Sequence, residues 1–380
     1  MNFSLSPEQQ SLQKAMIAFA KKELNQHIDS IGKAPVPAAL WKRCAEMGLT
    51  GACIDKTWGG NGLDTLSTMA LLEAIGYGCE DGGLNFSLCA QLLASTIPLH
   101  QFGTETQKKK YLPGICNGSL RTANAITEAG AGSDISAMQT TAEESGGHYV
   151  INGSKKYISN AADADMIIVF AVTDRSKGFF GGLTAFMIDS KAEGVSIGPD
   201  MEKMGLNSCR MNEITLTNVK TGKEDMLGGL GGGTAIFGFS MDWERAGIAV
   251  CHTGAMQALL ERCIHHAGNT GKDEALIKKQ AVSHRIADMK VQVEAARLLA
   301  YKAVKSIGTD RNSPLHCSIA KLFVSEAYVK MASEAVQLHG AAGYTKENGI
   351  ERILRDATAA TIYSGTSDIQ RNIISGWKNA

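Results

Sequence analysis

The sequence has no surplus of charge of either sign. Its 380 residues contain 38 Lys plus Arg and 38 Asp plus Glu, so the formal net charge is zero. A protein that binds nucleic acid or an anionic membrane through its overall field usually carries a marked basic excess. Charge balance therefore excludes a general polyanion binder and leaves room only for a small basic patch.

Long hydrophobic runs are also missing. The longest strongly apolar stretch, Met166 to Val172, is far shorter than the roughly 20 residues that a membrane-spanning helix needs. The N-terminus leads into Ser6-Pro7-Glu8-Gln9 instead of a basic stretch followed by an apolar run, so no signal peptide is expected. These absences predict a soluble, cytoplasmic protein.

The chain lacks the cysteine and histidine spacings of metal or redox motifs. It has nine cysteines, and neighbours such as Cys44 and Cys53 are too far apart for Cys-x-x-Cys. The pair His265-His266 and the separate His284 show no metal-ligand spacing either. We expect reduced, buried thiols and no bound metal.

A chain of this length is expected to form two or three domains, and residues 1–117 have the pattern of a helical one. Ser6 is a good helix cap, with Pro7 at the first helical position and an amide two residues later for a capping box. Gly59-Gly60-Asn61-Gly62 and Asp81-Gly82-Gly83 are predicted to be turns or loops between helices.

Residues 118–227 have the pattern of a β domain. His148 to Ile151 followed by Asn152-Gly153 predicts a strand that enters a tight hairpin. The apolar run Met166 to Val172 predicts a buried strand, and the alternation in Glu213 to Thr217 predicts a half-buried one.

Residues 228–380 return to a helical pattern. The glycine-dense segment Gly228 to Gly233 has two interpretations, a phosphate-cradling loop or a hinge-like connection. The second is favoured because no Lys-Ser or Lys-Thr and no βαβ unit accompany it. Long amphipathic segments follow at about 234–268, 274–308 and 313–339, the last closed by Gly340, with a shorter helical pattern from Ile350. Long helices with short connections pack as an antiparallel bundle, so the predicted fold class is α+β and multidomain.

Two short segments of the β region have the chemistry of a site. Ala125 to Asp134 offers the hydroxyls of Thr127 and Ser133 around a nearly side-chain-free backbone, which suits close approach to a planar heterocycle. Lys155 to Asn160 places Tyr157 and Ser159 on one side of a probable strand, where an aromatic packs in a core or lies against a ring system. Taken alone, each segment also fits a purely structural role.

Further segments resemble one known family. Together with the two above, Gln337-Leu338-His339-Gly340, Leu354-Arg355-Asp356-Ala357 and Ile362 to Gln370 resemble the acyl-CoA dehydrogenase family, in its usual order and over essentially the whole chain. The resemblance implies an N-terminal α-helical domain, a middle β-barrel and a C-terminal four-helix bundle in a homotetramer. It also implies FAD held between barrel and bundle and completed by a neighbouring subunit.

The resemblance assigns roles by motif position. The cofactor-binding residues that it implies are Ile126, Thr127, Ser133, Tyr157, Ser159, Gln280, Gln337, Thr366 and Asp368, with the two glutamines reaching a partner subunit's FAD. The residues that it implies next to substrate are Ser133, Asp242, Arg245 and Ser364. Asp242 either attracts a positively charged group of the substrate or forms a surface salt bridge.

The catalytic base is the main departure from the usual pattern. Family members remove an α-proton from a thioester with a carboxylate while hydride leaves the β-carbon for the flavin, and most keep that glutamate where this chain has Ser364. A minority carry the base on the bundle helix, at the position of Glu244. Here Glu244 shares an apolar helical stripe with residues such as Met241 and Ile248, so it should face the interior. A structural salt bridge is the alternative, but the missing glutamate at 364 favours catalysis.

A second departure concerns the FAD pyrophosphate. Most relatives have an Arg-x-x-Phe-Gly segment that reaches it from the partner subunit, whereas the aligned stretch here is Asn269-Thr270-Gly271-Lys272-Asp273. Lys272 is the hypothesised replacement.

Three segments, Ser240 to Ala246, Gln280 to Ala287 and Tyr363 to Asp368, together most resemble one branch of the family. That branch oxidises prolyl groups tethered to carrier proteins, in pyrrole-forming and anatoxin-type assembly lines. That resemblance implies a prolyl thioester on a carrier protein's phosphopantetheine as substrate, and either O2 or an electron-transfer flavoprotein as electron acceptor. An ordinary short- or branched-chain acyl-CoA dehydrogenase is the alternative function. A non-catalytic flavoprotein that binds a carrier protein is the third.

Overall fold

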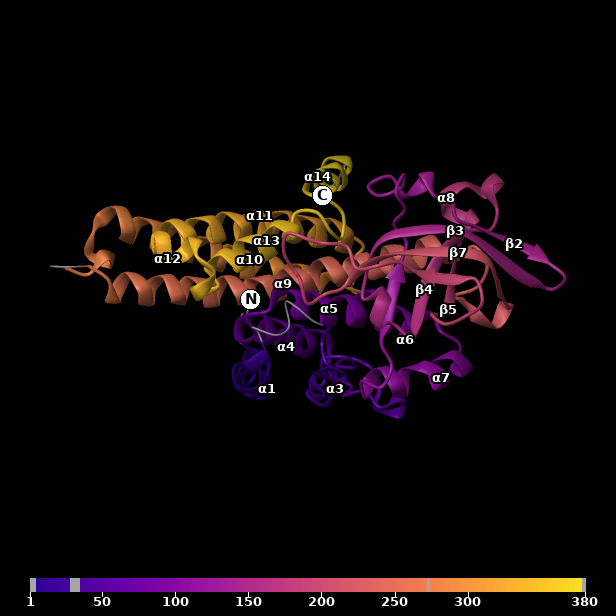
Figure 1. Cartoon of the computed structure of the whole chain (residues 1–380), viewed down its shortest axis with the longest axis horizontal. Helices are drawn as coiled ribbons and strands as arrows, with labels where there is room; N and C mark the ends of the chain where they lie inside the picture. The colour runs from indigo at the N-terminus through magenta and orange to yellow at the C-terminus, as the bar shows by residue number, and fades with distance from the viewer. Residues whose placement is uncertain (1–4, 28–34, 272–273, 378–380) are drawn as a thin grey trace.

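The computed structural model describes residues 5–27, 35–271 and 274–377, and its elements follow the predicted order of helices, strands and helices (Figure 1). The first helices are α1 (Pro7–Phe19), α3 (Ala38–Glu46), α4 (Thr65–Gly78), α5 (Gly82–Gln91), α6 (Ile97–Phe102) and α7 (Glu105–Cys116). The predicted capping box is confirmed, because the Ser6 hydroxyl accepts from the Gln9 N–H and the Gln9 side chain accepts from the Ser6 N–H. No helix among the described residues is long and apolar enough to cross a membrane.

The predicted loop at Asp81-Gly82-Gly83 does separate two helices, but its end is wrong, because only Asp81 of the three precedes α5, which begins at Gly82. The Asp81 carboxylate accepts hydrogen bonds from the N–H groups of Gly83 and Leu84, at 2.9 and 3.1 Å. A capping carboxylate satisfies the free N–H groups of a helix start and outweighs the low helix propensity of two glycines. These glycines therefore open a helix that packs against the other domains.

The middle region forms one mixed sheet. Its strands are β1 (Thr122–Ala125), β2 (Thr141–Ser145), β3 (His148–Ser159), β4 (Met166–Val172), β5 (Leu183–Asp189), β6 (Val195–Ile197), β7 (Met211–Thr221) and β8 (Met226–Leu227), with the short helix α8 (Gly178–Gly182) before β5. The order is β6-β7-β3-β2-β4-β5-β8, and β1 pairs with β4 in parallel. The buried strand β4 and the alternating burial of β7 confirm the predictions for those segments.

The predicted hairpin at Asn152-Gly153 is wrong, because β3 continues through it to Ser159. The tight turn lies earlier, at Gly146-Gly147, where both glycines have positive φ. At Gly153 the pairing of β3 with β7 shifts register, and a Cβ there would meet the Thr140 hydroxyl oxygen at 2.5 Å. An Asn-Gly pair in a strand therefore marks a β-bulge here, the other common use of glycine in strands.

The sheet has an apolar core on each face. Ile167 and Val169 of β4 pack with β3 and β7 side chains such as Ile151, whereas Ile168 and Phe170 of β4 face outward. The outward set packs against α6, α7 and the first turns of the long bundle helix. A strand that is buried on both faces explains why this segment reads as a continuous apolar run.

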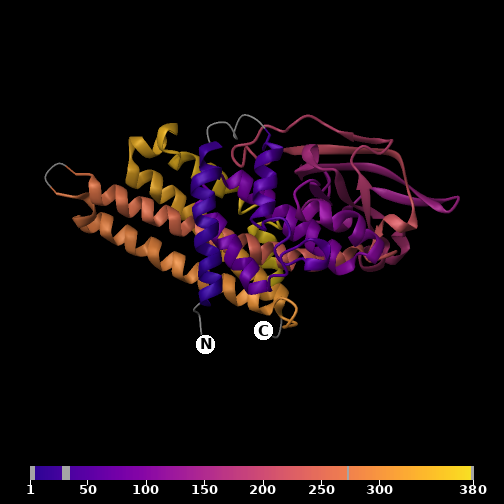
Figure 2. The same ribbon diagram turned by 90° about the horizontal axis from the view of Figure 1, so that it is seen from below.

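The C-terminal region is built from long helices. They are α9 (Gly233–Asn269), α10 (Gln280–Ser306) and α11 (Ser313–His339), followed by the shorter α12 (Ala341–Tyr344), α13 (Ile350–Ala359) and α14 (Ser367–Gly376). Gly340 ends α11 with a positive φ of 59°, as predicted. Helix α9 starts beside the β domain and runs to the outer end of the bundle, so it touches all three regions (Figures 1 and 2).

The N-terminal helices lie against one side of the bundle and cross it (Figure 2), and α4 packs directly on α9. Their backbones come very close at two glycines. A Cβ on Gly76 would lie 1.9 Å from the Cys251 carbonyl oxygen, and one on Gly254 would lie 2.0 Å from the Glu73 carbonyl oxygen. Only glycine permits this approach, which fixes the position of α9 against the N-terminal helices.

Candidate active site

A cavity of about 350 Å³ lies where the three regions meet. Its walls come from α5, β1, the end of β3, the first half of α9 and the loop before α14. Enclosed, largely apolar cavities between domains, with a few convergent polar groups, are the usual places for ligands. The polar groups of this cavity include Thr127, Ser159, Glu244 and Ser364.

Helix α9 contributes the acidic side of the cavity. Phe237, Met241 and Glu244 line it from successive turns, as their helical spacing predicts. Only 7% of Glu244 is exposed. An ionisable group in such a place is either paired or functional.

The Glu244 carboxylate is held by the loop before α14. The Ser364 hydroxyl donates to Glu244 Oε1 across 2.5 Å. Burial raises the pKa of Glu244, while the Ser364 hydrogen bond and the nearby charges of Arg245 and Lys321 act in the opposite direction. The result is a carboxylate whose pKa lies above its ordinary value yet which has donors to stabilise its ionised form.

Buried donors fix the backbone of this loop. Arg245 Nε donates to the Ser364 carbonyl at 3.2 Å, and Lys321 Nζ donates to the Gly365 carbonyl at 2.7 Å. The Gln370 amide reaches both carbonyls, at 3.1 and 2.8 Å. Within the described parts of the chain, the Ser364 N–H has no acceptor. Ser364 also has a positive φ of 54°, a conformation that such anchoring can maintain.

The β domain provides the opposite wall. Ile126, Thr127, Ser133, Tyr157 and Ser159 all line the cavity, so the structure brings these predicted residues together. The pairing of β3 with β7 shifts register again between Lys155 and Ile158, and Tyr157 has a φ of 62°. This irregularity leaves Tyr157 53% exposed at the cavity and out of the core of the sheet.

A buried ion pair braces the segment that carries Thr127. Lys155 is fully buried, and its Nζ lies 2.8 Å from Glu128 Oε1 and donates to the Ile126 carbonyl at 3.2 Å. The Thr140 hydroxyl and N–H also donate to Glu128. Because every charge here has partners, the pair can fix the wall without leaving an uncompensated charge.

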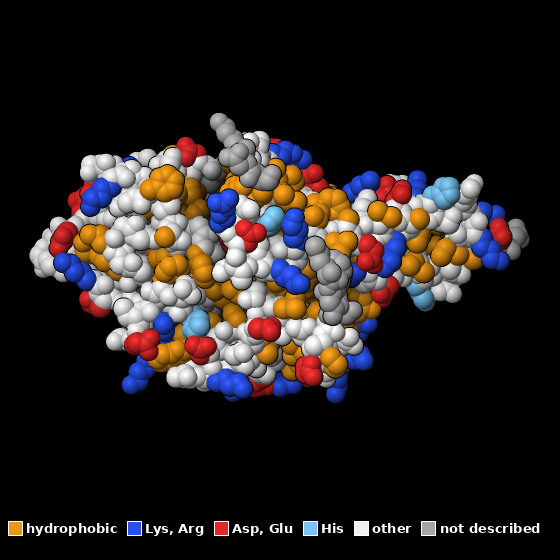
Figure 3. Space-filling model, turned by 180° about the vertical axis from the view of Figure 1, so that it is seen from behind, with side chains coloured by type: hydrophobic (Ala, Val, Ile, Leu, Met, Phe, Trp, Pro, Cys, Tyr) orange, Lys and Arg blue, Asp and Glu red, His pale blue; other side chains and the backbone are white. Residues whose placement is uncertain are grey.

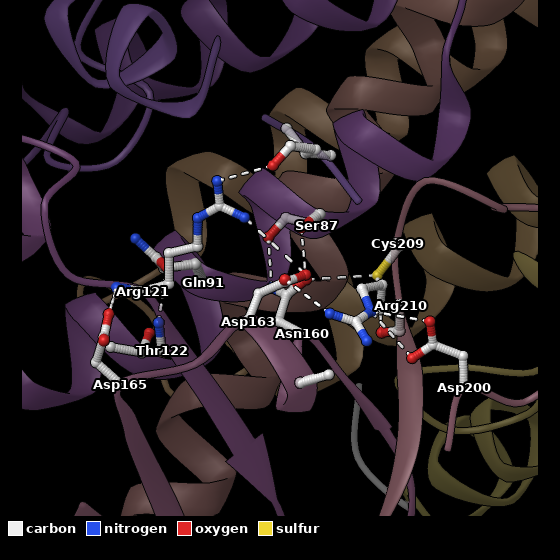
Figure 4. Close-up of polar contacts among 12 residues, drawn as sticks. Ser87, Gln91, Arg121, Thr122, Asn160, Asp163, Asp165, Asp200, Cys209 and Arg210 are labelled. Atoms are coloured by element: carbon white, nitrogen blue, oxygen red, sulfur yellow. Dashed lines mark hydrogen bonds and ion pairs between the residues drawn. The ribbon is translucent and has the colours of Figure 1, made fainter. Parts of the chain in front are cut away.

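A polar network joins the end of β3 to α5 and β7 (Figure 4). The Ser87 hydroxyl donates to Asn160 Oδ1 at 2.5 Å, and the Asn160 amide donates to the Ser87 carbonyl at 3.0 Å. Arg210 bridges Asp163 and Asp200 at 3.1 and 2.9 Å. This network holds the turn after Ser159 and therefore the floor of the cavity.

The same view shows how the start of β1 is fixed (Figure 4). Gln91 of α5 accepts a hydrogen bond from the Thr122 N–H at 2.9 Å, and Asp165 accepts one from the Arg121 N–H at 2.9 Å. Thr122 is one of the residues that line the cavity, and its hydroxyl is buried with no partner among the described residues. A buried hydroxyl without a partner beside a cavity is a group that a small shift of its side chain would bring to a polar ligand.

Other predicted residues lie outside the cavity lining. Asp242 is not among the lining residues, and its carboxylate lies beside Ser313 and Arg245; its predicted contact with substrate stays a prediction. Thr366 caps α14 by accepting from the Ile369 N–H. Asp368 is exposed and pairs with Arg371 at 3.3 Å.

The two predicted glutamines are exposed at the outer end of the bundle. Gln280 is the first residue of α10 and Gln337 lies near the end of α11. Lys272, the hypothesised phosphate ligand, lies outside the described residues.

Several site residues were not found from the sequence. Asn160 lines the cavity with a φ of 65°, and asparagine is one of the residues that tolerate this conformation. Lys321 has no sequence signal, since a lysine on a long helix is usually solvated. Phe86 also lines the cavity, but in the sequence it cannot be told from an ordinary apolar residue of a helix.

Comparison with family models covers most of the chain. The N-terminal domain of acyl-CoA dehydrogenase matches residues 6–119, the middle domain matches 123–219 and the C-terminal domain matches 231–377.

Individual relatives match over nearly their whole length. An L-prolyl-[peptidyl-carrier protein] dehydrogenase of Serratia sp. (strain ATCC 39006) is 36% identical over 376 residues, which are 98% of this chain and 97% of that protein. The crystal structure of the prolyl acyl carrier protein oxidase AnaB is 38% identical with a TM-score of 0.95, covering 99% of this chain and 100% of that one. The structure of PigA with FAD and proline is 35% identical with a TM-score of 0.95, covering 99% and 98%.

Proposed function

Because this chain belongs to the acyl-CoA dehydrogenase family, we propose that it uses FAD to oxidise a prolyl group held as a thioester on a carrier protein. The observation that carries the proposal is the buried Glu244 carboxylate beside Ser364. The similarity to a prolyl-carrier-protein dehydrogenase and to AnaB supports the substrate class. The product is a prolyl ring desaturated by two electrons or carried on towards a pyrrole.

Glu244 is the base in this mechanism. Its ionised carboxylate takes the α-proton of the prolyl thioester, which becomes acidic as the thioester carbonyl is polarised. A pKa above the ordinary value makes the carboxylate a stronger base, and the Ser364 hydroxyl keeps it oriented. The role of the Ser364 side chain is therefore to position the carboxylate, not to remove the proton.

The backbone N–H of Ser364 is placed to bind the thioester oxygen of the substrate. Its N–H has no acceptor among the described residues and borders the cavity, so it can donate to the thioester oxygen as that atom gains enolate charge. Arg245, Lys321 and Gln370 hold the carbonyls of the same loop, which preorganises that donor.

The β wall fits the flavin ring. Thr127, Ser133, Tyr157 and Ser159 would hold it from the side opposite Glu244, with the Ile126 backbone beside them. When bound, FAD supplies the acceptor for the hydride that leaves the substrate's β-carbon. Thr366 and Asp368 lie at the start of α14, in the segment between the cavity-lining residues Gly365 and Ile369. We propose that they too contact the cofactor.

We also propose a homotetramer in which Gln280 and Gln337 meet the FAD of a partner subunit. Both side chains are exposed at the outer end of the bundle, remote from the cavity of their own chain. The bundle also presents apolar side chains to solvent (Figure 3). Among them are Val291 and Leu298 of α10. Exposed apolar surface on projecting helices supports an interface between copies.

Two experiments test this function. Anaerobic mixing with prolyl-loaded carrier protein should bleach the flavin, whereas isovaleryl-CoA should not. The reverse result would establish the alternative, a short- or branched-chain acyl-CoA dehydrogenase. Binding of the carrier protein without bleaching would establish a non-catalytic carrier-binding flavoprotein. A peroxide assay in air then separates transfer to O2 from transfer to an electron-transfer flavoprotein.

A further inference from the structure

Two more voids lie behind the active-site cavity. The first measures about 20 Å³ and shares Phe86 with the cavity. The second measures about 610 Å³ and shares Ala255, Tyr328 and Asp356, among others, with the small void. The three spaces therefore follow one another along α9, away from the β domain. Whether an acyl group can pass from the active-site cavity into these voids depends on what separates the cavity from the 20 Å³ void.

The barrier is a set of packed rings. Tyr363 lines the cavity and stacks on Phe86 with ring centroids 4.3 Å apart. The Tyr363 hydroxyl shares a hydrogen bond with His252 Nε2 at 2.9 Å, and the His252 ring lies 5.1 Å from that of Tyr328. Three of these four residues, Phe86, His252 and Tyr328, line the small void from the other side.

We propose that the hydrogen-bonded pair His252–Tyr363 is the end wall of the acyl-binding space and limits the substrate to a small ring or short chain. This inference rests on the proposed function, because it takes the acyl group to sit beside Glu244. It assigns substrate selection to His252, which does not line the catalytic cavity itself.

The spacing of Glu244 and His252 on α9 limits the length of the acyl group. Glu244 and His252 are eight positions apart, which places them on similar faces of the helix and about 12 Å apart along its axis. An acyl group with its α-carbon at Glu244 that extends along α9 meets Tyr363 and then His252. A void of about 20 Å³ has room for about one water molecule and none for further methylene groups.

The wall is uncharged. Burial lowers the pKa of His252 to about 3 and raises that of Tyr363 well above its ordinary value. Both groups stay neutral near pH 7, so the wall can border an apolar ring without a buried charge. A longer acyl group would enter only by breaking the hydrogen bond between them and leaving both polar groups unpaired.

The test measures binding of non-reactive alkyl thioether analogues of pantetheine, from butyl to octyl, through the change in flavin absorbance of the holoenzyme. The wild type should bind butyl at least tenfold more tightly than octyl. His252→Ala should reduce that preference at least tenfold, and His252→Gln, which keeps a hydrogen-bonding group, should restore most of it. His265→Ala is the matched control, an exposed histidine on the same helix, and should leave the preference unchanged.

Equal binding of butyl and octyl by the wild type, or an unchanged preference in His252→Ala, would overturn the inference. If His252→Ala fails to fold, Tyr363→Phe tests the same wall, because it removes the hydrogen bond and keeps the ring stack. Failure of the proposed prolyl substrate would show separately, as absence of bleaching by prolyl-loaded carrier protein, and would leave the length preference intact.

Discussion

The hydroxyl of Ser364 donates a hydrogen bond to Glu244 across 2.5 Å, although 120 positions separate the two residues in the chain. By the resemblance of the motifs, Ser364 stands where most family members carry their catalytic glutamate, and Glu244 stands where a minority carry it. Contact between the two side chains means that a carboxylate from either position reaches the same part of the cavity. With Glu244 as the base, as we propose, the base could change its place in the sequence without changing its place in the site.

This contact predicts that the base can be moved. Glu244→Ala should abolish most flavin reduction by substrate. The double variant Glu244→Ala with Ser364→Glu should reduce the flavin at least about tenfold faster than Glu244→Ala alone. Anaerobic stopped-flow absorbance measures both. A double variant no faster than Glu244→Ala would show that the two positions do not serve one site.

Removing only the Ser364 hydroxyl should change the pH dependence. That hydroxyl lowers the pKa of Glu244 against the opposing effect of burial, so Ser364→Ala should raise the pKa further. Proton removal needs the ionised carboxylate, so the rate rises with pH through that pKa. The rising limb of the rate of flavin reduction should therefore move to higher pH. At pH values below that limb, the variant should reduce the flavin about tenfold more slowly than the wild type. An unmoved limb would mean that the hydroxyl does not tune Glu244.

Asp356 predicts a pH effect on stability. It accepts a hydrogen bond from the Leu206 N–H at 2.6 Å, and burial raises its pKa to about 6. Between the unfolded value of 3.8 and about 6 the folded chain binds more protons than the unfolded chain, so this group's contribution to stability falls as pH rises through that window.

Asp356→Asn keeps an acceptor for Leu206 and cannot ionise. The free energy of unfolding of the variant minus that of the wild type should therefore rise by up to about 3 kcal/mol from pH 4 to pH 7. Urea denaturation at the two pH values measures the difference. Asp368→Asn, on the exposed start of α14, is the control. An equal difference between Asp356→Asn and wild type at both pH values would contradict the assignment.

The sequence predicted the family, the order of the three regions and the burial of Glu244. Helical periodicity suffices for the last point, because Phe237, Met241 and Ile248 place Glu244 on an apolar face whatever packs against it. The capping box at Ser6 was equally predictable, since it depends on neighbouring residues alone.

Features that depend on tertiary contact were missed. An Asn-Gly pair is common to hairpins and bulges, and only the pairing of β3 with β7 shows that Gly153 is a bulge. Lys321 and His252 are single polar residues on long helices. What they bind, the Gly365 carbonyl and the Tyr363 hydroxyl, comes from a loop whose position no local pattern records.

The most direct test of the mechanism is the rate of anaerobic flavin reduction by prolyl-loaded carrier protein in Glu244→Gln, which keeps the shape of the side chain and its hydrogen bonding but cannot take a proton. The variant should bind FAD as the wild type does and reduce it on the order of a hundredfold more slowly, a loss of roughly 3 kcal/mol of transition-state stabilisation. Reduction at the wild-type rate would show that another group removes the α-proton and would contradict the account.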